Sequence, residues 1–162
     1  MCVTKTVLSS PVHFLAFGFG SGLSPRAPGT VGTLVAVPLY LLMVRLPWEY
    51  YILLLVAAIV LGVWLCGESA RLLGVHDHGG IVWDEFVGFW LTMLFVPPEW
   101  LWIALGFLLF RLFDVWKPWP IRFIDQHVHG GLGIMLDDIL AGIFALFVLQ
   151  LIVMSYATYF TV

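Results

Sequence analysis

A run of 17 uncharged and mostly apolar residues, 50–66, constrains the fold of this chain more than any other feature. As a helix it measures about 25 Å, close to the roughly 30 Å hydrocarbon core of a bilayer. Hydrophobic residues make up 62% of the chain and charged residues only 10%, with a mean hydropathy of +1.03. These values lie well outside the usual globular range. The sequence therefore predicts an integral membrane protein.

The 162 residues predict a single domain, 1–162, without a separate soluble catalytic unit. Its apolar segments predict an all-α, polytopic membrane protein with about five transmembrane or partly re-entrant helices in one compact bundle. The expected segments are 30–44, 50–66 with a polar extension to Gly74, 81–96, 100–113 and 134–155. Residues 12–17 are expected to form a short interfacial helix, followed by a loop over 18–32. The third helix is expected to end at Pro97, because proline removes a backbone donor. Alternatively, the third and fourth segments form a re-entrant pair.

Basic residues predict the orientation of these helices. If five helices alternate in direction, six of the seven Lys and Arg residues fall on one face, and only Arg45 falls on the other. The positive-inside rule makes the first face cytoplasmic. Most acidic residues share that face, and only Glu49 and Glu99 lie opposite. The polar chemistry is therefore expected at the cytoplasmic surface.

Composition disfavours nucleic-acid binding and also a site or scaffold built from cysteines. The net charge is −3 and no Lys/Arg cluster is present, so the electrostatic footprint of nucleic-acid binding is missing. The two cysteines, Cys2 and Cys66, have no metal-ligand spacing and form no disulfide framework. Cys66 lies in an apolar run and is expected to be buried.

Two pairs of adjacent carboxylates, Asp84 with Glu85 and Asp137 with Asp138, are expected at or near helix starts on this face. Packed together, the pairs would repel one another unless a cation lay between them. Oxygen ligands of this kind suit Mg²⁺, which binds through one or two carboxylates, waters and substrate phosphate oxygens. The alternative is that these residues only favour the helix dipoles and cap the helices. Two pairs on one face favour metal binding.

Basic residues follow in the segment 111–122, which separates two apolar segments. Arg111, Lys117 and Arg122 predict a phosphate site, since Arg binds phosphate through two nitrogens and Lys as a point charge. Asp114 and Lys117 share a helix face if the helix reaches Lys117. Two prolines, Pro118 and Pro120, are expected to force an extended stretch that presents Arg122. The alternative is that the basic residues only contact anionic lipid.

A Gly/Pro-rich loop, 24–33, feeds the first long helix. Its backbone N–H groups are suited to an anion, with Thr30 or Thr33 as the helix cap, although a plain capped loop fits as well. The histidines His76, His78, His127 and His129 lie in Gly-containing loops. They are expected to be polar loop residues, because imidazole is not the preferred ligand of a hard cation.

Four ordered motifs closely resemble the bacterial phosphatidylglycerophosphatase A family over nearly the whole chain. They are GFGSGLSPRAPGTVGTL at 18–34, VHDHGGIVWDEFVG at 75–88, FRLFDVWKPWPIR at 110–122 and HGGLGIMLDDILAG at 129–142. This resemblance implies a Mg²⁺-dependent, multi-pass enzyme of the bacterial inner membrane whose active site faces the cytoplasm. It removes the terminal phosphate of phosphatidylglycerophosphate to give phosphatidylglycerol. Soluble relatives resemble helical bundles, in agreement with the all-α prediction.

The residues singled out above fit that activity, because a lipid can present its headgroup to helix ends at the membrane surface while its acyl chains stay in the bilayer. Asp84, Glu85, Asp137 and Asp138 are expected to hold Mg²⁺, with support from Asp77 and Asp114. Lys117 and Arg122 would neutralise the phosphate, with Arg111 and Thr30 as further phosphate ligands. A metal-activated water would attack in line. An Asp nucleophile, giving an aspartyl-phosphate, is the alternative.

Rival functions lack their signatures. The PSGH-type motif of His-dependent lipid phosphatases and the Asp/Gly/Arg pattern of CDP-alcohol phosphotransferases are both missing from the sequence. A cation or proton carrier that uses the clustered carboxylates is the non-enzymatic rival. Carriers commonly bind ions near the bilayer midplane, whereas these carboxylates are expected at helix ends.

Overall fold

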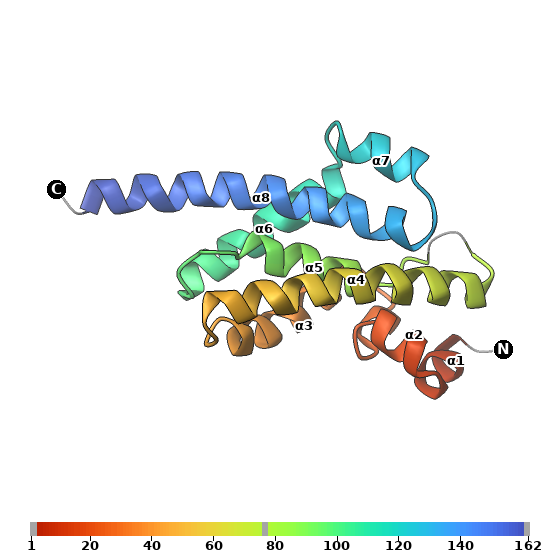
Figure 1. Cartoon of the computed structure of the whole chain (residues 1–162). Coiled ribbons are helices and arrows are strands. Elements are labelled where there is room, and N and C mark those ends of the chain that lie inside the picture. The colour runs from red at the N-terminus through yellow and green to blue at the C-terminus, as the bar shows by residue number, and fades with distance from the viewer. Residues whose placement is uncertain (1–2, 76–77, 161–162) are drawn as a thin grey trace.

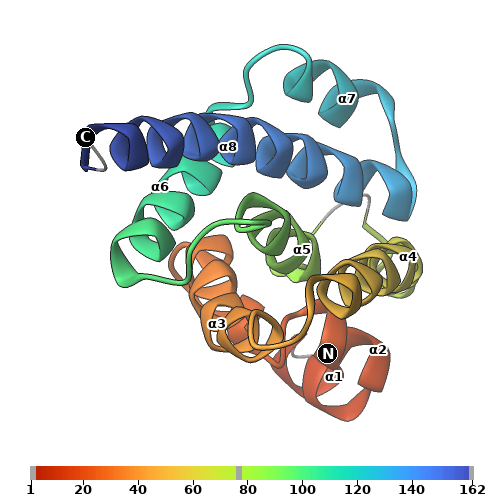
Figure 2. The same ribbon diagram turned by 60° about the vertical axis from the view of Figure 1, so that its left-hand side comes forward.

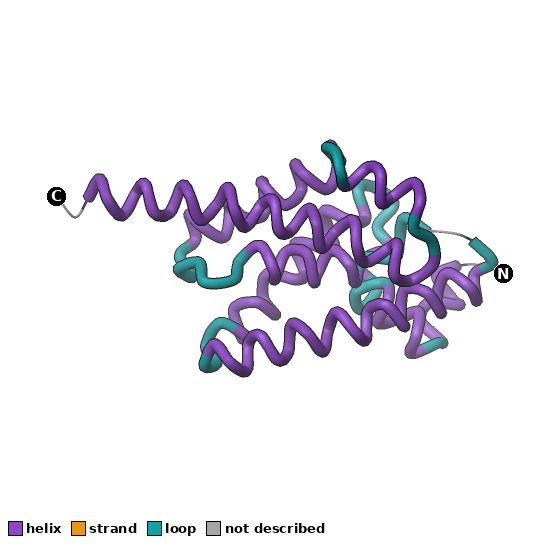
Figure 3. The backbone as a smooth tube through the Cα atoms, turned by 45° about the horizontal axis from the view of Figure 1, so that its top comes forward, coloured by secondary structure: helices purple, strands orange, loops and turns teal. Residues whose placement is uncertain are grey.

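The computed structural model describes residues 3–75 and 78–160, and this part of the chain is helical without strands. The elements are α1 (Val3–Ser9), α2 (Pro11–Ala16), the 3₁₀ helix η1 (Ser21–Leu23), α3 (Pro28–Met43), α4 (Trp48–Leu73), α5 (Trp83–Thr92), α6 (Trp100–Trp116), α7 (Ile121–His127) and α8 (Gly130–Phe160). The helices α3, α4, α5, α6 and α8 alternate in direction along the bundle (Figures 1 and 3). The all-α prediction is confirmed.

Helix α5 is the centre of the bundle. It packs against α3, α4, α6 and α8, which surround it in Figure 2. Its aromatic residues Phe86 and Phe89 are fully buried, and Trp90 is nearly so. Residues 86–91 of α5 are all apolar, and a helical stretch that is apolar on every side belongs in the interior of a protein, which explains this central position.

Five helices occupy the five predicted segments, but the count of five spanning helices is not confirmed. In the described residues, only α4 and α8 have both the length and the apolar composition to cross a bilayer. Helix α3 has 16 residues, or about 24 Å, and α5 has 10, or about 15 Å. The third helix was predicted to continue to Pro97, yet it ends at Thr92. A proline disfavours the helical backbone conformation of the residue before it, which is Val96 here, so the chain leaves the helix before that residue.

The other helix ends follow local sequence signals. Helix α4 stops at the left-handed residue Gly74 (φ +70°), where the sequence predicted its end. Helix α3 begins with Pro28 at its first turn, where the missing N–H costs nothing. Three short helices were not predicted: α1, η1 within the loop expected over 18–32, and α7, which replaces the extended stretch expected to present Arg122. Helix α2 matches the short helix expected at 12–17 within one residue at each end.

Interhelical hydrogen bonds fix α5 within the bundle. The indole N–H of Trp83 donates to Ala58 O of α4 over 3.1 Å, and that of Trp90 donates to Ala36 O of α3 over 3.0 Å. The hydroxyl of Tyr51 donates to Trp90 O over 2.6 Å. Thr92 donates to Gly142 O of α8 over 3.3 Å. Such bonds between otherwise apolar helices hold one element in a defined rotation, and here they orient the first turn of α5.

Small residues allow the helices to approach closely. A Cβ at Gly142 would lie 2.5 Å from Gly88 O, so α5 and α8 meet backbone to backbone. A Cβ at Gly131 would lie 1.9 Å from Val63 O and 2.7 Å from Gly67 N. Helix α8 therefore crosses α4 and α5 at glycines on both sides of Asp137 and Asp138, which fixes the depth of these two carboxylates.

Replacing Gly131 by Ala is expected to destabilise the protein by about 1 to 3 kcal/mol, because the new methyl group meets backbone atoms that cannot move aside. Thermal unfolding in detergent, followed by far-UV circular dichroism, measures this effect. Gly79→Ala is the matched control, since a Cβ there meets nothing within 4 Å. Equal unfolding temperatures for Gly131→Ala and the wild type would contradict the close helix crossing.

The amino-terminal helices attach to α4 through a buried polar pair. His13 Nδ1 of α2 lies 2.8 Å from Ser69 Oγ, and both residues are buried. Burial lowers the pKa of His13, although the charge of Glu68 partly opposes this shift. The neutral imidazole therefore serves as a hydrogen-bond partner within the fold.

The outer faces of the long helices remain apolar. Exposed side chains include Leu53, Val60 and Trp64 on α4, and Phe147 and Leu151 on α8. In the most apolar 18-residue stretch of α4 only 28% is buried within the protein, and in that of α8 only 22%. An exposed apolar surface of this extent is typical of a chain that contacts lipid.

Candidate active site

Polar residues of three helices meet at one end of the bundle. Asp84 and Glu85 lie in the first turn of α5, Arg111 and Asp114 in the last turns of α6, and Asp137 and Asp138 in α8. The carboxylates of Asp84, Glu85, Asp114 and Asp137 are all close enough to Asp138 to repel its charge. The structure thus brings together both carboxylate pairs that the sequence singled out.

These carboxylates are largely withdrawn from solvent. Asp138 is 3% exposed, Asp84 and Asp137 are each 8% exposed, and the Glu85 and Asp114 side chains are 13% exposed. Burying several like charges is costly unless cations compensate them. The fold therefore maintains an arrangement that needs positive charge.

The position of Asp137 and Asp138 argues against a capping role. Helix α8 was expected to begin at about Ile134, but it begins at Gly130, so these residues lie about two turns inside it. Their side chains cannot reach the free backbone N–H groups of the first turn. Asp84 and Glu85 do lie in a first turn, where the helix dipole favours them.

Arg111 is one of two cations inside the cluster. Its Nη1 lies 3.1 Å from Glu85 Oε1 and 2.5 Å from Asp114 Oδ2, and its side chain is 17% exposed. These two contacts engage Nη1, whereas Nε has no hydrogen-bond acceptor in the described residues. A buried guanidinium with unused donors is suited to bind a further anion.

Lys117 is the second cation, and two carboxylates hold it. Its Nζ lies 2.6 Å from Asp125 Oδ1 of α7 and 2.6 Å from Asp137 Oδ2 of α8. Burial lowers the pKa of Lys117, but the hydrogen bonds with Asp125 and Asp137 outweigh it and raise the pKa above its ordinary value. Lys117 therefore stays charged and links α7 to α8.

Asp114 and Lys117 were expected to share a helix face if the helix reached Lys117, and it does not. Helix α6 ends at Trp116, and Lys117 adopts a left-handed conformation (φ +46°) that turns its side chain away from that face. Asp114 pairs with Arg111 instead.

The amino-terminal turn of α3 supports Glu85. A Cβ at Gly29 would lie 1.9 Å from Glu85 Oε1, and one at Gly32 would lie 3.1 Å from Glu85 Oε2. The hydroxyl of Thr33 lies 3.4 Å from Glu85 Oε2 and donates to Gly29 O over 3.0 Å. A side chain in place of Gly29 would therefore displace this carboxylate from α3. Gly29, Gly32 and Thr33 stand three and four residues apart and so share one face of α3, a pattern in the sequence that could have indicated this role.

Thr30 and Thr33 are not helix caps, contrary to the prediction. The cap position is Ala27, in a left-handed conformation, and it makes no side-chain capping bond. Thr30 lies within the first turn of α3 and is partly exposed, while Thr33 lies one turn further along and is buried.

Asp77 lies outside the described residues. Within the described part of the chain, no group of three or more His, Cys, Asp or Glu side chains is placed to hold a metal ion. Mg²⁺ needs only one or two carboxylates when phosphate oxygens and water complete its shell. The donor set of Asp84, Glu85, Asp137 and Asp138 consists of hard oxygen atoms and fits that requirement.

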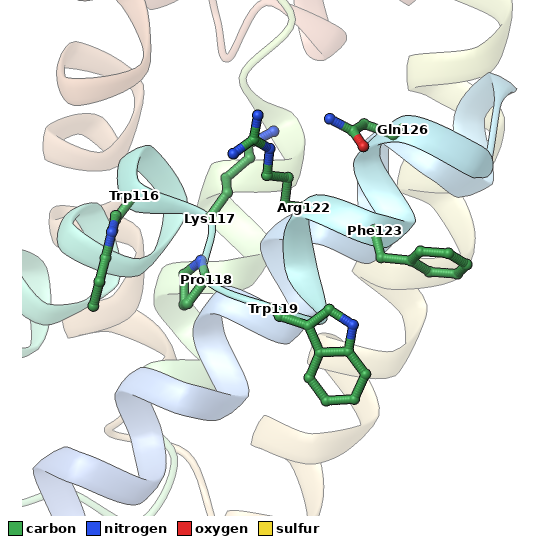
Figure 4. Close-up of a pocket in the computed structure, with 7 residues that line it drawn as sticks. All are labelled: Trp116, Lys117, Pro118, Trp119, Arg122, Phe123 and Gln126. Carbon is green, nitrogen blue, oxygen red and sulfur yellow. The ribbon is translucent and has the colours of Figure 1, made fainter.

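A pocket of about 520 Å³ adjoins the cluster. It is lined by Trp116, Lys117, Pro118, Trp119, Arg122, Phe123 and Gln126 (Figure 4). Lys117 belongs to both the pocket and the cluster, so a ligand in the pocket lies next to the carboxylates. Arg122, a predicted phosphate ligand, is exposed and lies on α7.

The comparisons with known proteins agree with one another. The family model described as Phosphatidylglycerophosphatase A matches residues 14–153. Phosphatidylglycerophosphatase A of Escherichia coli K12 is 54% identical over 150 residues, which cover 92% of this chain and 87% of the relative. The protein of that name from Haemophilus influenzae is 45% identical over 146 residues, with 89% and 90% coverage.

A third relative has a different name. It is a putative phosphatidylinositol-3-phosphatase of Bacteroides thetaiotaomicron, 40% identical over 139 residues, which cover 79% of this chain and 84% of the relative. No solved structure matches the chain significantly. The match of the family model and the two closely similar relatives confirm the resemblance of the four motifs, and the chain belongs to the phosphatidylglycerophosphatase A family.

Proposed function

We propose that this phosphatase hydrolyses phosphatidylglycerophosphate to phosphatidylglycerol and inorganic phosphate in a Mg²⁺-dependent reaction. The observation that carries the proposal is the convergence of four carboxylates on the buried Asp138, with Arg111 paired to two of them, beside a cationic pocket at one end of the bundle. The names of the relatives support a lipid phosphomonoester as substrate.

The proposed location is the bacterial inner membrane, with several passes and the site facing the cytoplasm. The exposed apolar faces of α4 and α8 support contact with lipid, and the excess of Lys and Arg at the site end supports the orientation. Trp116 and Trp119, which are 69% and 82% exposed beside the site, suit the headgroup layer. A lipid headgroup would reach the cluster from this layer while its acyl chains stay in the bilayer.

Asp84, Glu85, Asp137 and Asp138 are the residues that would hold Mg²⁺, with Asp114 as support through its ion pair with Arg111. When bound, Mg²⁺ neutralises phosphate oxygens and promotes ionisation of a water molecule. Arg111 offers its unused donors to the phosphate that is transferred. Lys117, held by Asp125 and Asp137, keeps a fixed positive charge between the cluster and the pocket.

The proposed step is attack by water on the terminal phosphorus. A carboxylate of the cluster accepts the proton that the water releases, the bond from phosphorus to the glycerol oxygen breaks, and the glycerol oxygen takes up a proton. An Asp carboxylate acting as nucleophile is the alternative, and acid-quenched labelling with radioactive substrate would detect the aspartyl-phosphate.

Purified protein in detergent micelles tests the function. We expect phosphate release from phosphatidylglycerophosphate that depends on Mg²⁺ and stops when a chelator removes it. Absence of phosphate release, together with cation flux in liposomes, would favour the carrier instead. Far-UV circular dichroism of the chelated protein distinguishes loss of activity from loss of fold.

A further inference from the structure

We propose that the pocket formed by α7 and the end of α6 is a second anion subsite, which binds the phosphodiester of the lipid while the carboxylate cluster holds the terminal phosphate. This inference rests on the proposed function and deepens it. Arg122 and Gln126 would be the specificity-determining residues, and the preferred substrates would be lipids whose headgroup carries a phosphomonoester and is joined through a phosphodiester.

The cations around the site divide into two groups. Arg111 and Lys117 are engaged by carboxylates, Arg111 by Glu85 and Asp114, and Lys117 by Asp125 and Asp137. Arg122 forms no ion pair or side-chain hydrogen bond with any residue of the described ranges 3–75 and 78–160. It therefore has all its donors available for a ligand.

The pocket combines features that suit a phosphodiester at a membrane surface. In Figure 4 the polar ends of Lys117, Arg122 and Gln126 gather on one side, and the rings of Trp119 and Phe123 lie on another. A guanidinium and an amide N–H group together match the two free oxygens of a diester. The aromatic rings, 82% and 53% exposed, are placed to contact the lipid that continues from it.

The geometry also explains why two phosphates would be held in sequence. Lys117 lines the pocket and contacts Asp137 of the cluster, so its side chain lies between the pocket and the cluster. In phosphatidylglycerophosphate a glycerol unit separates the diester from the terminal monoester. A diester at Arg122 therefore directs the terminal phosphate past Lys117 toward Arg111, whereas phosphatidic acid, with a single phosphate, engages only one subsite.

The test is Arg122→Gln, assayed in mixed micelles with phosphatidylglycerophosphate. We expect KM to rise about tenfold with little change in kcat, since one charged contact is lost from substrate binding. Phosphatidylglycerol, which carries only the diester, should weaken as a competitive inhibitor by a similar factor. Inorganic phosphate, which reports on the cluster, should inhibit as it does in the wild type. Gln126→Leu should act in the same direction by about threefold.

Arg26→Gln is the matched control, because Arg26 is an exposed arginine just before α3, at the same end of the protein. Equal effects of Arg26→Gln and Arg122→Gln would overturn the subsite and indicate general attraction to anionic lipid. Unchanged kinetics of Arg122→Gln, or a parallel loss of inhibition by inorganic phosphate, would also overturn it. A wild-type protein that releases no phosphate would instead overturn the proposed function, and this inference with it.

Discussion

Replacing Asp138 by Asn is expected to lower kcat/KM for phosphatidylglycerophosphate by about 10³-fold or more. Asp138 is 3% exposed and lies within electrostatic reach of four other carboxylates, so a negative charge at this position calls for a bound cation. Asn keeps the size of the side chain but removes that charge. Asp84→Asn removes a charge from the facing helix and is expected to have an effect of similar size.

The measurement is phosphate release over a range of Mg²⁺ concentrations. If Asp84 and Asp138 hold the metal, the concentration needed for half-maximal activity should rise in both variants, in addition to the loss at saturation. Thermal unfolding should show no loss of stability, because the substitution removes one of several buried like charges. Full activity of both Asn variants would refute the site.

Two controls separate a local effect from a general one. Glu99→Gln changes an exposed carboxylate at the far end of α6 and should leave activity unchanged. Asp125→Asn removes one of the two partners of Lys117, whose other partner, Asp137, remains. Its effect should be about 10- to 100-fold, smaller than that of Asp138→Asn, as expected for a residue that supports the site without contacting the reacting group.

Composition and pattern predicted much of the fold. The long apolar runs predicted α3, α4, α6 and α8, because hydrophobic length is a property of each segment alone. The central position of α5 was harder to predict from the sequence, since a short apolar helix has the same composition whether lipid or protein surrounds it. Helix α7 was missed because Pro118 and Pro120 were expected to prolong an extended backbone, whereas the helix begins at Ile121, directly after them.

The site was predictable in its residue types but not in its pairings. The scarcity of charge elsewhere singled out the carboxylates at 84–85 and 137–138, and alternation of the helices brought them to one end. The partners of Lys117 depend on the residue at which α6 ends and on the left-handed backbone at that point. The packing of Gly29 against Glu85 depends on how α3 crosses α5, which is a tertiary property.

Arg111→Lys is expected to lower kcat/KM by about 100-fold, although the charge is conserved. A single guanidinium nitrogen, Nη1, contacts both Glu85 and Asp114, and a lysine ammonium in its place would leave no further nitrogen to present donors to a phosphate. The loss should be accompanied by weaker competitive inhibition by inorganic phosphate. This second readout distinguishes a role in phosphate binding from a purely structural one.

Arg71→Lys is the matched control, because Arg71 also pairs with a carboxylate three residues away, Glu68, but its side chain is 68% exposed and lies outside the cluster. Its activity should equal that of the wild type, since exposed ion pairs contribute little. Wild-type kcat/KM in Arg111→Lys would show that only the charge at this position matters, and the unused donors of Arg111 would then have no part in binding phosphate. A 100-fold loss together with an unchanged unfolding temperature would instead assign those donors to the substrate, because the ion pairs that support the fold would still be formed.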